Sequence, residues 1–452
     1  MRALILAPFV LAFSLQANDT NSKDISQDVY CLYTQAHWID FTSRCHSSKY
    51  TPDDANEESK IFYVKDTHTF SQGTVWNTQV FTANYKNGTL VLGNDKKESG
   101  TGTIRFGQGG WQGHIEANFN VKEAFLTGNL IAGNEVQPSA TGGGATININ
   151  ASNSIEAKDF TLTFVMNSTN SHANFKADSI SMENAKFHLQ AGGHTLKFES
   201  NKDIDIKGSG SYMNLYAGTA GYGGAEARFK GENLNFAGTI VLGRESGDDA
   251  WLDSALNGAK IYVEDIKGKA SFGTIKSRKG HIIANSNMSI DTLEILQSAQ
   301  GATGHDISPE SRLFLKDNGT YTIKNLTLHD DQASSRAWLY VYGGTGSSLT
   351  SENITLGVNS AFHSGGIANL TSKSLTLKSG AAFHGGAITQ TKVDTIALGS
   401  NSVAHFHNLT LTPGGQITMD ATNAQLVLDN QLINGKNQAG VLELGVSMKD
   451  YA

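Results

Sequence analysis

The sequence feature that most constrains the fold is a short repeat in the C-terminal third of the chain. Pairs of apolar residues, with one residue between them, recur there in steps of 21 residues. These pairs are Ile354 and Leu356, Leu375 and Leu377, Ile396 and Leu398, and Ile417 and Met419. Apolar residues at alternate positions are typical of a strand with one buried face. A propeller blade needs about twice this period, whereas one coil of a parallel β-helix fits it.

Two further positions repeat with the same step. The apolar series is Ile367, Ile388 and Leu409, and the histidine series is His363, His384 and His405. Paired glycines follow two of the histidines, and glycine supplies the backbone freedom that a tight corner needs. In stacked coils, equivalent residues form columns along the axis at strand spacing. We therefore predict an all-β protein that folds as a right-handed parallel β-helix, which is a solenoid.

A longer period lies upstream. The pattern Ala-x-Phe, followed by an alternating apolar pair, begins at positions 117, 173 and 227. These starts are almost evenly spaced, and the interval is long enough for one sequence module to correspond to two or three coils. Strand-like pairs fill most of the remainder, and helical periodicity is weak. The β-helix repeats are predicted over residues 101–452.

Composition favours one continuous, exported body. The 452 residues include 48 glycines and only 5 prolines, and 17% of the residues are charged. The net charge is -7 and no run of Lys or Arg occurs, so no nucleic-acid partner is expected. No apolar stretch of about 18 residues follows the N-terminus, so no transmembrane segment is expected in the mature chain.

Residues 1–17 have the pattern of a secretory signal peptide. Arg2 gives a positive start, an apolar run extends from Ala3 to Phe13, and Ala17 is a small residue at the cleavage position. A buried N-terminal strand is the alternative, but the polar residues 18–22 favour the signal peptide. The chain is therefore expected to be exported through the periplasm, and then to reach the cell surface and outer membrane or to be secreted.

Residues 18–100 are predicted to form an N-terminal cap, because their first part fits the repeat poorly. The end coil of a solenoid exposes its apolar core and an unpaired strand edge unless a cap covers them. Cys31 and Cys45 are the only cysteines, and an oxidising compartment favours one disulfide between them. His37 and His46 lie nearby, but their spacing is not that of a metal site, which is the weaker alternative.

The sequence contains none of the common hydrolase motifs, and its candidate acidic sites occur only as isolated pairs. Paired aspartates occur at 248–249, at 330–331 and at 203 and 205, but isolated pairs are common in solvated turns. Neither a G-x-S-x-G nor an H-E-x-x-H motif is present. We expect no enzyme activity, no cofactor and no catalytic or metal-ligating residue.

The histidine series is the sharpest site-like feature. If the coils stack in register, adjacent imidazoles can hold a metal or respond to acid by charging together. The alternative is a corner position that tolerates histidine beside the paired glycines. We favour this alternative, because no carboxylate recurs with the same step to support a metal site.

These features together resemble the passenger region of vacuolating-cytotoxin-like autotransporters. The resemblance rests on the modules at 117, 173 and 227, on the Asn-Leu-Thr-Leu segments at 325–328 and 408–411, and on the signal sequence. It covers about residues 100–430 and implies a β-helix that is exported by the type V route and exposed at the bacterial surface. Two features of the family are missing. The sequence ends within passenger-like repeats, before any C-terminal barrel, and residues 18–60 lack the apolar small-xxx-small stretch of a pore, so pore formation is not expected.

The expected function follows from the resemblance and from the lack of a catalytic motif. We expect a non-enzymatic, secreted or surface-exposed passenger that contacts the host-cell surface or other passenger proteins, in host-cell interaction or colonisation. The first alternative is a glycan-processing β-helix enzyme, which needs three or more acidic or basic groups in one groove. The second alternative is a non-functional fragment of a larger autotransporter gene.

Overall fold

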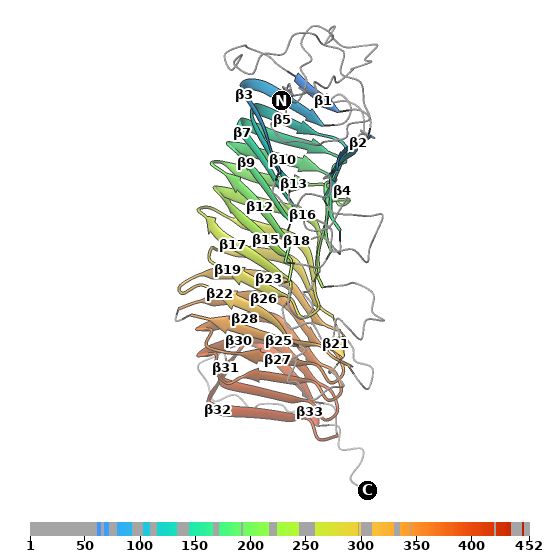
Figure 1. The fold of residues 1–452 in the computed structure, drawn as a ribbon. Helices are drawn as coiled ribbons and strands as arrows, with labels where there is room; N and C mark the ends of the chain where they lie inside the picture. The colour runs from blue at the N-terminus through green and yellow to red at the C-terminus, as the bar shows by residue number, and fades with distance from the viewer. Residues whose placement is uncertain are drawn as a thin grey trace, which may run out of the picture. The chain divides into compact units, whose positions relative to one another are not determined.

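The computed structural model contains only β-strands as regular elements in the residues that it describes. These residues are 61–64, 67–71, 79–92, 103–108, 115–132, 144–165, 171–190, 193–216, 224–243, 258–296, 298–299, 310–329, 335–344, 346–419, 422–434 and 445–446. The chain divides into two compact units, residues 1–186 and residues 187–452. Within each unit the strands lie side by side in successive coils (Figure 1).

The first unit is a stack of parallel strands arranged as three ladders. Its strands are β1 (Ile61–Val64), β2 (Thr67–Ser71), β3 (Gln79–Leu92), β4 (Thr103–Gln108), β5 (Ile115–Leu126), β6 (Asn129–Ala132), β7 (Ala145–Lys158), β8 (Thr161–Phe164), β9 (His172–Ala177) and β10 (Ser179–Glu183). Face 1 is the ladder β3–β5–β7–β9, face 2 is β1–β3–β5–β7–β10, and face 3 is β2–β4–β6–β8. Strands β3, β5 and β7 are long enough to belong to two faces.

The second unit repeats this three-faced plan over more coils. Its strands are β11 (Lys186–Leu189), β12 (Thr195–Ser200), β13 (Asp203–Lys207), β14 (Tyr212–Leu215), β15 (Glu226–Gly231), β16 (Asn233–Leu242), β17 (Lys260–Ile266), β18 (Ala270–Ser277), β19 (His281–Ala284), β20 (Met288–Ile295), β21 (Ser298–Ala299), β22 (Glu310–Leu315), β23 (Thr320–Leu328), β24 (Ser335–Arg336), β25 (Trp338–Gly343), β26 (Ser348–Leu356), β27 (Ala361–Ser364), β28 (Asn369–Leu377), β29 (Ala382–Gly385), β30 (Gln390–Leu398), β31 (Val403–Met419), β32 (Gln425–Asn434) and β33 (Gly445–Val446).

Three parallel ladders run through the second unit. Face 1 is β12–β15–β17–β19–β22–β25–β27–β29–β31–β32. Face 2 is β13–β16–β18–β20–β23–β26–β28–β30–β31–β32, and face 3 continues from β14 through the second halves of the same long strands to β33. The short pair β21–β24 is antiparallel and lies outside the ladders. The predicted parallel β-helix is thus confirmed in each unit.

The predicted short step is confirmed on face 3. Ile354 pairs with Leu375, Leu375 with Ile396, and Ile396 with Ile417, and all four side chains are buried. The register arises because one coil rises by one strand spacing, so residues one period apart come into contact. Upstream, Ala117 pairs with Ile147, which pairs with Ala173, so the longer step corresponds to two coils.

The prediction that Leu409 continues the series of Ile367 and Ile388 is wrong. Leu409 pairs instead with Thr391, because β31 passes from face 1 to face 2 without the turn that precedes β30. At the next corner β31 has more residues than β30: Val393 pairs with Leu411, and Thr395 pairs with Gln416. A shorter first corner is therefore offset by a longer second one, and the coil keeps its length.

The corner between face 3 and face 1 uses residues that tolerate left-handed backbone. Asn359, Gly380, Asn401 and Asn423 occupy this corner in successive coils, with φ values of 55°, 68°, 57° and 55°. Glycine and asparagine adopt this conformation with the least strain. The amide of Asn423 also donates a hydrogen bond of 3.3 Å to the amide oxygen of Asn401, which links two corners.

Several predictions fall at the N-terminal end of the chain. The signal peptide at residues 1–17, both cysteines and most of the cap at 18–100 lie outside the described residues. Within 61–92, strands β1 and β3 pair with each other, and β3 pairs with β5 in the parallel ladders. In the described residues no helix is long and apolar enough to cross a membrane.

Candidate functional site

The three predicted histidines lie in one column on the outer side of face 1. His363 in β27 pairs with His384 in β29, which pairs with His405 in β31. The rings of His363 and His384 are stacked, with centroids 4.5 Å apart and planes at 18°. Their neighbours Phe362 and Phe383 point inward and are buried, so alternation along the strand leaves the histidines half-buried on the surface.

Aromatic side chains extend this column on its N-terminal side. The ring of Tyr340 stacks on His363 at 4.4 Å and 12°, and Trp338 contacts the same histidine edge-on at 6.2 Å. Tyr342 lies beside Tyr340 and stacks on Phe314 at 5.1 Å. We call Trp338, Tyr340, His363, His384 and His405 the aromatic column. The sequence predicted the three histidines but not the tyrosine and tryptophan that continue them.

The last histidine of the column contacts a carboxylate. Nε2 of His405 donates a hydrogen bond of 2.7 Å to Oδ1 of Asp429, and Nδ1 of His407 lies 3.7 Å from the other oxygen. This hydrogen bond from His405 lowers the pKa of the Asp429 carboxyl. Burial lowers the pKa of His384, and the neighbouring charge of His405 adds to the effect. The described residues contain no group of three His, Cys, Asp or Glu side chains placed to hold a metal.

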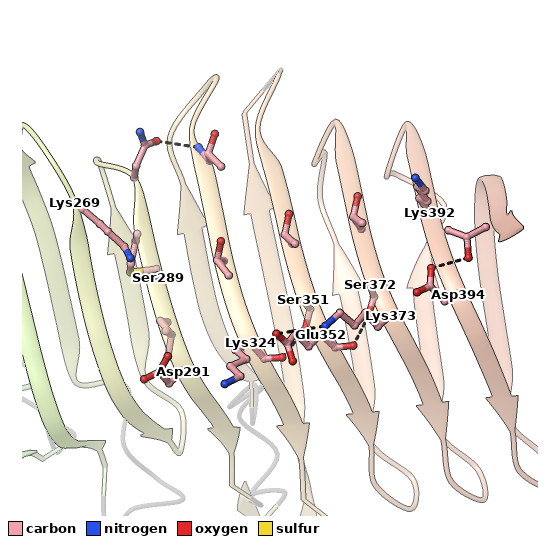
Figure 2. A pocket seen from close by; sticks show the side chains of 18 of the residues that line it. Lys269, Ser289, Asp291, Lys324, Ser351, Glu352, Ser372, Lys373, Lys392 and Asp394 are labelled. Atoms are coloured by element: carbon pink, nitrogen blue, oxygen red, sulfur yellow. Dashed lines mark hydrogen bonds and ion pairs between the residues drawn. The ribbon is translucent and has the colours of Figure 1, made fainter. Parts of the chain in front are cut away.

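A second surface feature, which the sequence did not predict, is a groove along face 2 of the second unit. This open groove has a volume of about 740 Å³ and crosses the strands from β20 to β31. Its floor is a row of hydroxyl side chains on successive strands, namely Ser289, Thr322, Thr350 and Thr371. Figure 2 shows the side chains of this groove projecting from adjacent parallel strands.

A row of charged side chains lies beside the hydroxyl row, where face 2 bends into face 3. In strand order its members are Asp291, Lys324, Glu352, Lys373 and Asp394, so the sign alternates from coil to coil (Figure 2). Opposite charges on neighbouring strands stabilise a sheet, which accounts for the alternation. We call the hydroxyl row and this charged row, together with Lys269 and Lys392, the polar groove.

The charged groups of the polar groove differ in their partners. Nζ of Lys373 lies 3.6 Å from Oε1 of Glu352, and the hydroxyl of Thr412 donates a hydrogen bond of 2.7 Å to Asp394. Within the described residues, the side chains of Asp291, Lys324 and Lys392 form neither an ion pair nor a hydrogen bond. The sequence carried a partial signal, because positions 352, 373 and 394 follow the same short step as the apolar pairs.

Of the predicted aspartate pairs, the structure describes Asp203 and Asp205, which do not line the polar groove. Asp203 and Asp205 lie in strand β13 rather than in a turn, and they accept hydrogen bonds of 2.9 and 2.8 Å from Asn233 and Asn235. Because β13 pairs with β16, each aspartate lies directly beside an asparagine of the next coil and can accept a hydrogen bond from it. The pairs at 248–249 and 330–331 lie outside the described residues, as do Cys31 and Cys45.

In the first unit, hydrogen bonds between asparagine side chains link successive strands on the outer side of face 1. Asn148 donates a hydrogen bond of 2.7 Å to Asn118 and accepts one of 2.6 Å from Asn174, while Asn150 bonds Asn120 at 2.9 Å. Each amide has both donors and acceptors, so it can bond the coil above and the coil below. Among the described side chains, this asparagine column extends from β5 to β9.

Comparison with known proteins relates this part of the chain to a family. Residues 110–172 match the family model described as "Putative vacuolating cytotoxin", and they include β5 to β8 with most of the asparagine column. Searches of curated proteins and of solved structures find no match. Residues 110–172 are therefore similar to a vacuolating-cytotoxin family, which confirms over these residues the family resemblance predicted from the sequence.

Proposed function

We propose that this chain is the passenger of an autotransporter, exported through the periplasm to the cell surface and outer membrane or secreted, where it binds host-cell surface molecules or other passengers without catalysing a reaction. The match to a vacuolating-cytotoxin family supports a toxin-like role outside the cell. The predicted signal peptide at residues 1–17 supports export.

The aromatic column is the observation that carries this proposal. Trp and Tyr are enriched in protein interfaces and dominate their hot spots. Here Trp338 and Tyr340 are half-buried on an outer face, where a strand of a water-exposed sheet ordinarily has small polar side chains. Stacking against His363 holds the Tyr340 ring in place before any partner arrives, and such preorganisation lowers the entropy lost on binding.

The test is binding of the fluorescently labelled full chain to cultured epithelial cells. We expect saturable binding, and we expect the double variant Trp338→Ser, Tyr340→Ser to bind about ten-fold or more weakly, as loss of hot-spot side chains does. Tyr212→Ser is the matched control, because it removes a half-buried tyrosine from face 3. Absence of saturable binding, or equal binding by the double variant, would refute the proposal.

The polar groove favours a glycan-processing enzyme as the second candidate. Three carboxylates and four lysines line this groove, which meets the requirement for several acidic or basic groups in one place. Such an enzyme uses a carboxylate pair to protonate the leaving group and to activate water or form a covalent intermediate. The test is an assay for new reducing ends in polysaccharides incubated with the protein. This candidate would be supported over the first if the parent and the control Glu232→Gln release reducing ends and Glu352→Gln does not.

A further inference from the structure

The structure assigns a second binding surface to the second unit, separate from the aromatic column. We propose that the polar groove binds an extended oligosaccharide that carries carboxylate or sulfate groups. The aromatic column lies on face 1 and the groove on face 2, so this proposal does not depend on the passenger function proposed first; it concerns the same groove as the second candidate but requires binding alone, without cleavage.

The shape of the groove selects an extended ligand. It crosses β20, β23, β26, β28, β30 and β31, which are consecutive in the face 2 ladder. Five strand spacings correspond to a length of about 24 Å. A compact apolar molecule would find no enclosed pocket along this length, whereas a linear chain can contact every coil that it crosses.

The floor of the groove suits a ligand rich in hydroxyl groups. Ser289, Thr322, Thr350 and Thr371 present hydroxyls on successive strands, and a hydroxyl can donate one hydrogen bond and accept two. The hydroxyl of Ser289 already donates a hydrogen bond of 3.2 Å to Ser271, so it is available to a ligand as an acceptor. Sugar hydroxyls have the same capacity, so the two rows can pair in either direction. The methyl groups of the threonines offer apolar contact to the C–H groups of a sugar ring.

The charges of the groove select an anionic ligand. Glu352 and Lys373 compensate each other, and Asp394 already accepts a hydrogen bond from Thr412. The groups that remain without a side-chain partner among the described residues are the ammonium groups of Lys269, Lys324 and Lys392 and the carboxylate of Asp291. Four lysines and three carboxylates line the groove, and Asp394 keeps its charge because its partner Thr412 is neutral, so the groove has one more positive than negative charge on a chain whose net charge is -7, which is complementary to an anion.

Two other polymers fit the groove less well. Single-stranded nucleic acid is held by aromatic side chains on which its bases stack, and no described residue that lines the groove is aromatic. An extended peptide is held by hydrogen bonds to a free strand edge, but each groove strand from β23 to β30 pairs with a strand on both sides. An anionic sugar polymer needs neither feature.

Titration of the full chain with oligosaccharide probes tests the proposal. The probes are a heparin octasaccharide for sulfate, an oligogalacturonate for carboxylate, a maltooligosaccharide as the neutral control, and single-stranded DNA as the control for any polyanion. We expect one or both anionic sugars to bind, in a salt-dependent manner, and the neutral sugar and the DNA to bind at least ten-fold more weakly. Equal binding of the DNA, or binding of neither anionic sugar, would overturn the proposal.

Matched variants then locate the binding. Lys324→Gln with Lys392→Gln should weaken binding by about ten-fold or more, since each unpaired ammonium loses a charge-assisted contact. The control Lys202→Gln with Lys230→Gln removes the same charge from exposed lysines outside the groove and should bind as the parent does. Thr350→Val with Thr371→Val keeps the charge and shape but removes two hydroxyls, and it should also weaken binding. Equal losses in the groove and control lysine variants, or no loss in either groove variant, would contradict the assignment.

Discussion

Replacement of Phe383 by alanine should open the coils around it while the rest of the protein stays folded. The Phe383 side chain is fully buried inside the second unit. Its ring stacks on Phe362 with centroids 4.9 Å apart and contacts Phe406 at 5.2 Å, so three coils share one buried row of phenylalanine rings. Because each coil of a solenoid contacts only its neighbours, the loss should stay local.

The expected magnitude follows from what the substitution removes. Truncation of a buried phenylalanine to alanine costs about 3–5 kcal/mol, part of which is the cavity that it leaves. The cavity cannot collapse easily here, because ladder hydrogen bonds fix β29 to β27 on one side and to β31 on the other. The equilibrium constant for local opening should therefore rise between about 100-fold and about 4,000-fold.

Hydrogen exchange measured by mass spectrometry checks this prediction. Peptides from residues 361–419 should lose protection in Phe383→Ala, and peptides from residues 115–164 should not. Phe314→Ala is the control, because it removes the same ring from the outer side of face 1, where it is only half-buried. Unchanged protection in residues 361–419, or an equal loss in both regions, would refute the reasoning.

Four further substitutions test the corners, the histidines and the asparagine column. Gly238→Ala should destabilise the second unit by about 3 kcal/mol in urea unfolding, because a Cβ would overlap the carbonyl oxygen of Ser211. At Gly414 an added Cβ would meet no atom within 4 Å, but φ is 85°, so Gly414→Ala should cost only about 1 kcal/mol. Equal losses of stability in the two glycine variants would contradict the steric argument. Because the pKa of His384 is lower in the folded protein, the unfolded chain takes up a proton at a higher pH than the folded protein does. The free energy of unfolding should therefore be highest above about pH 6.5 and should fall as the pH drops towards the pKa of the folded state. His384→Gln should flatten that dependence, and an unchanged pH profile of urea unfolding would speak against it. Asn148→Ala should cost about 1–2 kcal/mol, since it breaks a hydrogen bond on each side, with faster exchange confined to the first unit.

Much of the fold was accessible from the sequence. The short period of the C-terminal repeat specified the coil, because residues one period apart must meet when each coil rises by one strand. Alternation along each strand specified which side chains point inward, and the buried column from Ile354 to Ile417 follows it. The histidine column obeys the same rule and was predicted from the same step.

The polar groove shows where this reasoning fails. Glu352, Lys373 and Asp394 are one period apart, but Lys324 and Asp291 join the row after longer and unequal intervals. The extra residues lie in the segments between strands, which carry no periodic pattern. Only the pairing of β20 with β23 and of β23 with β26 brings these charges into line.

The two Asn-Leu-Thr-Leu segments show most clearly what the sequence determined and what the tertiary structure decided. Both sequences predict a strand with buried leucines, and the leucines of both are buried. Residues 325–328 nevertheless belong to face 3, whereas residues 408–411 belong to face 2. Local sequence sets strand propensity and the inward side of a strand. The face that a strand joins depends on the lengths of the preceding corners and on hydrogen bonds to the neighbouring coil, which form only when the chain has closed a complete turn.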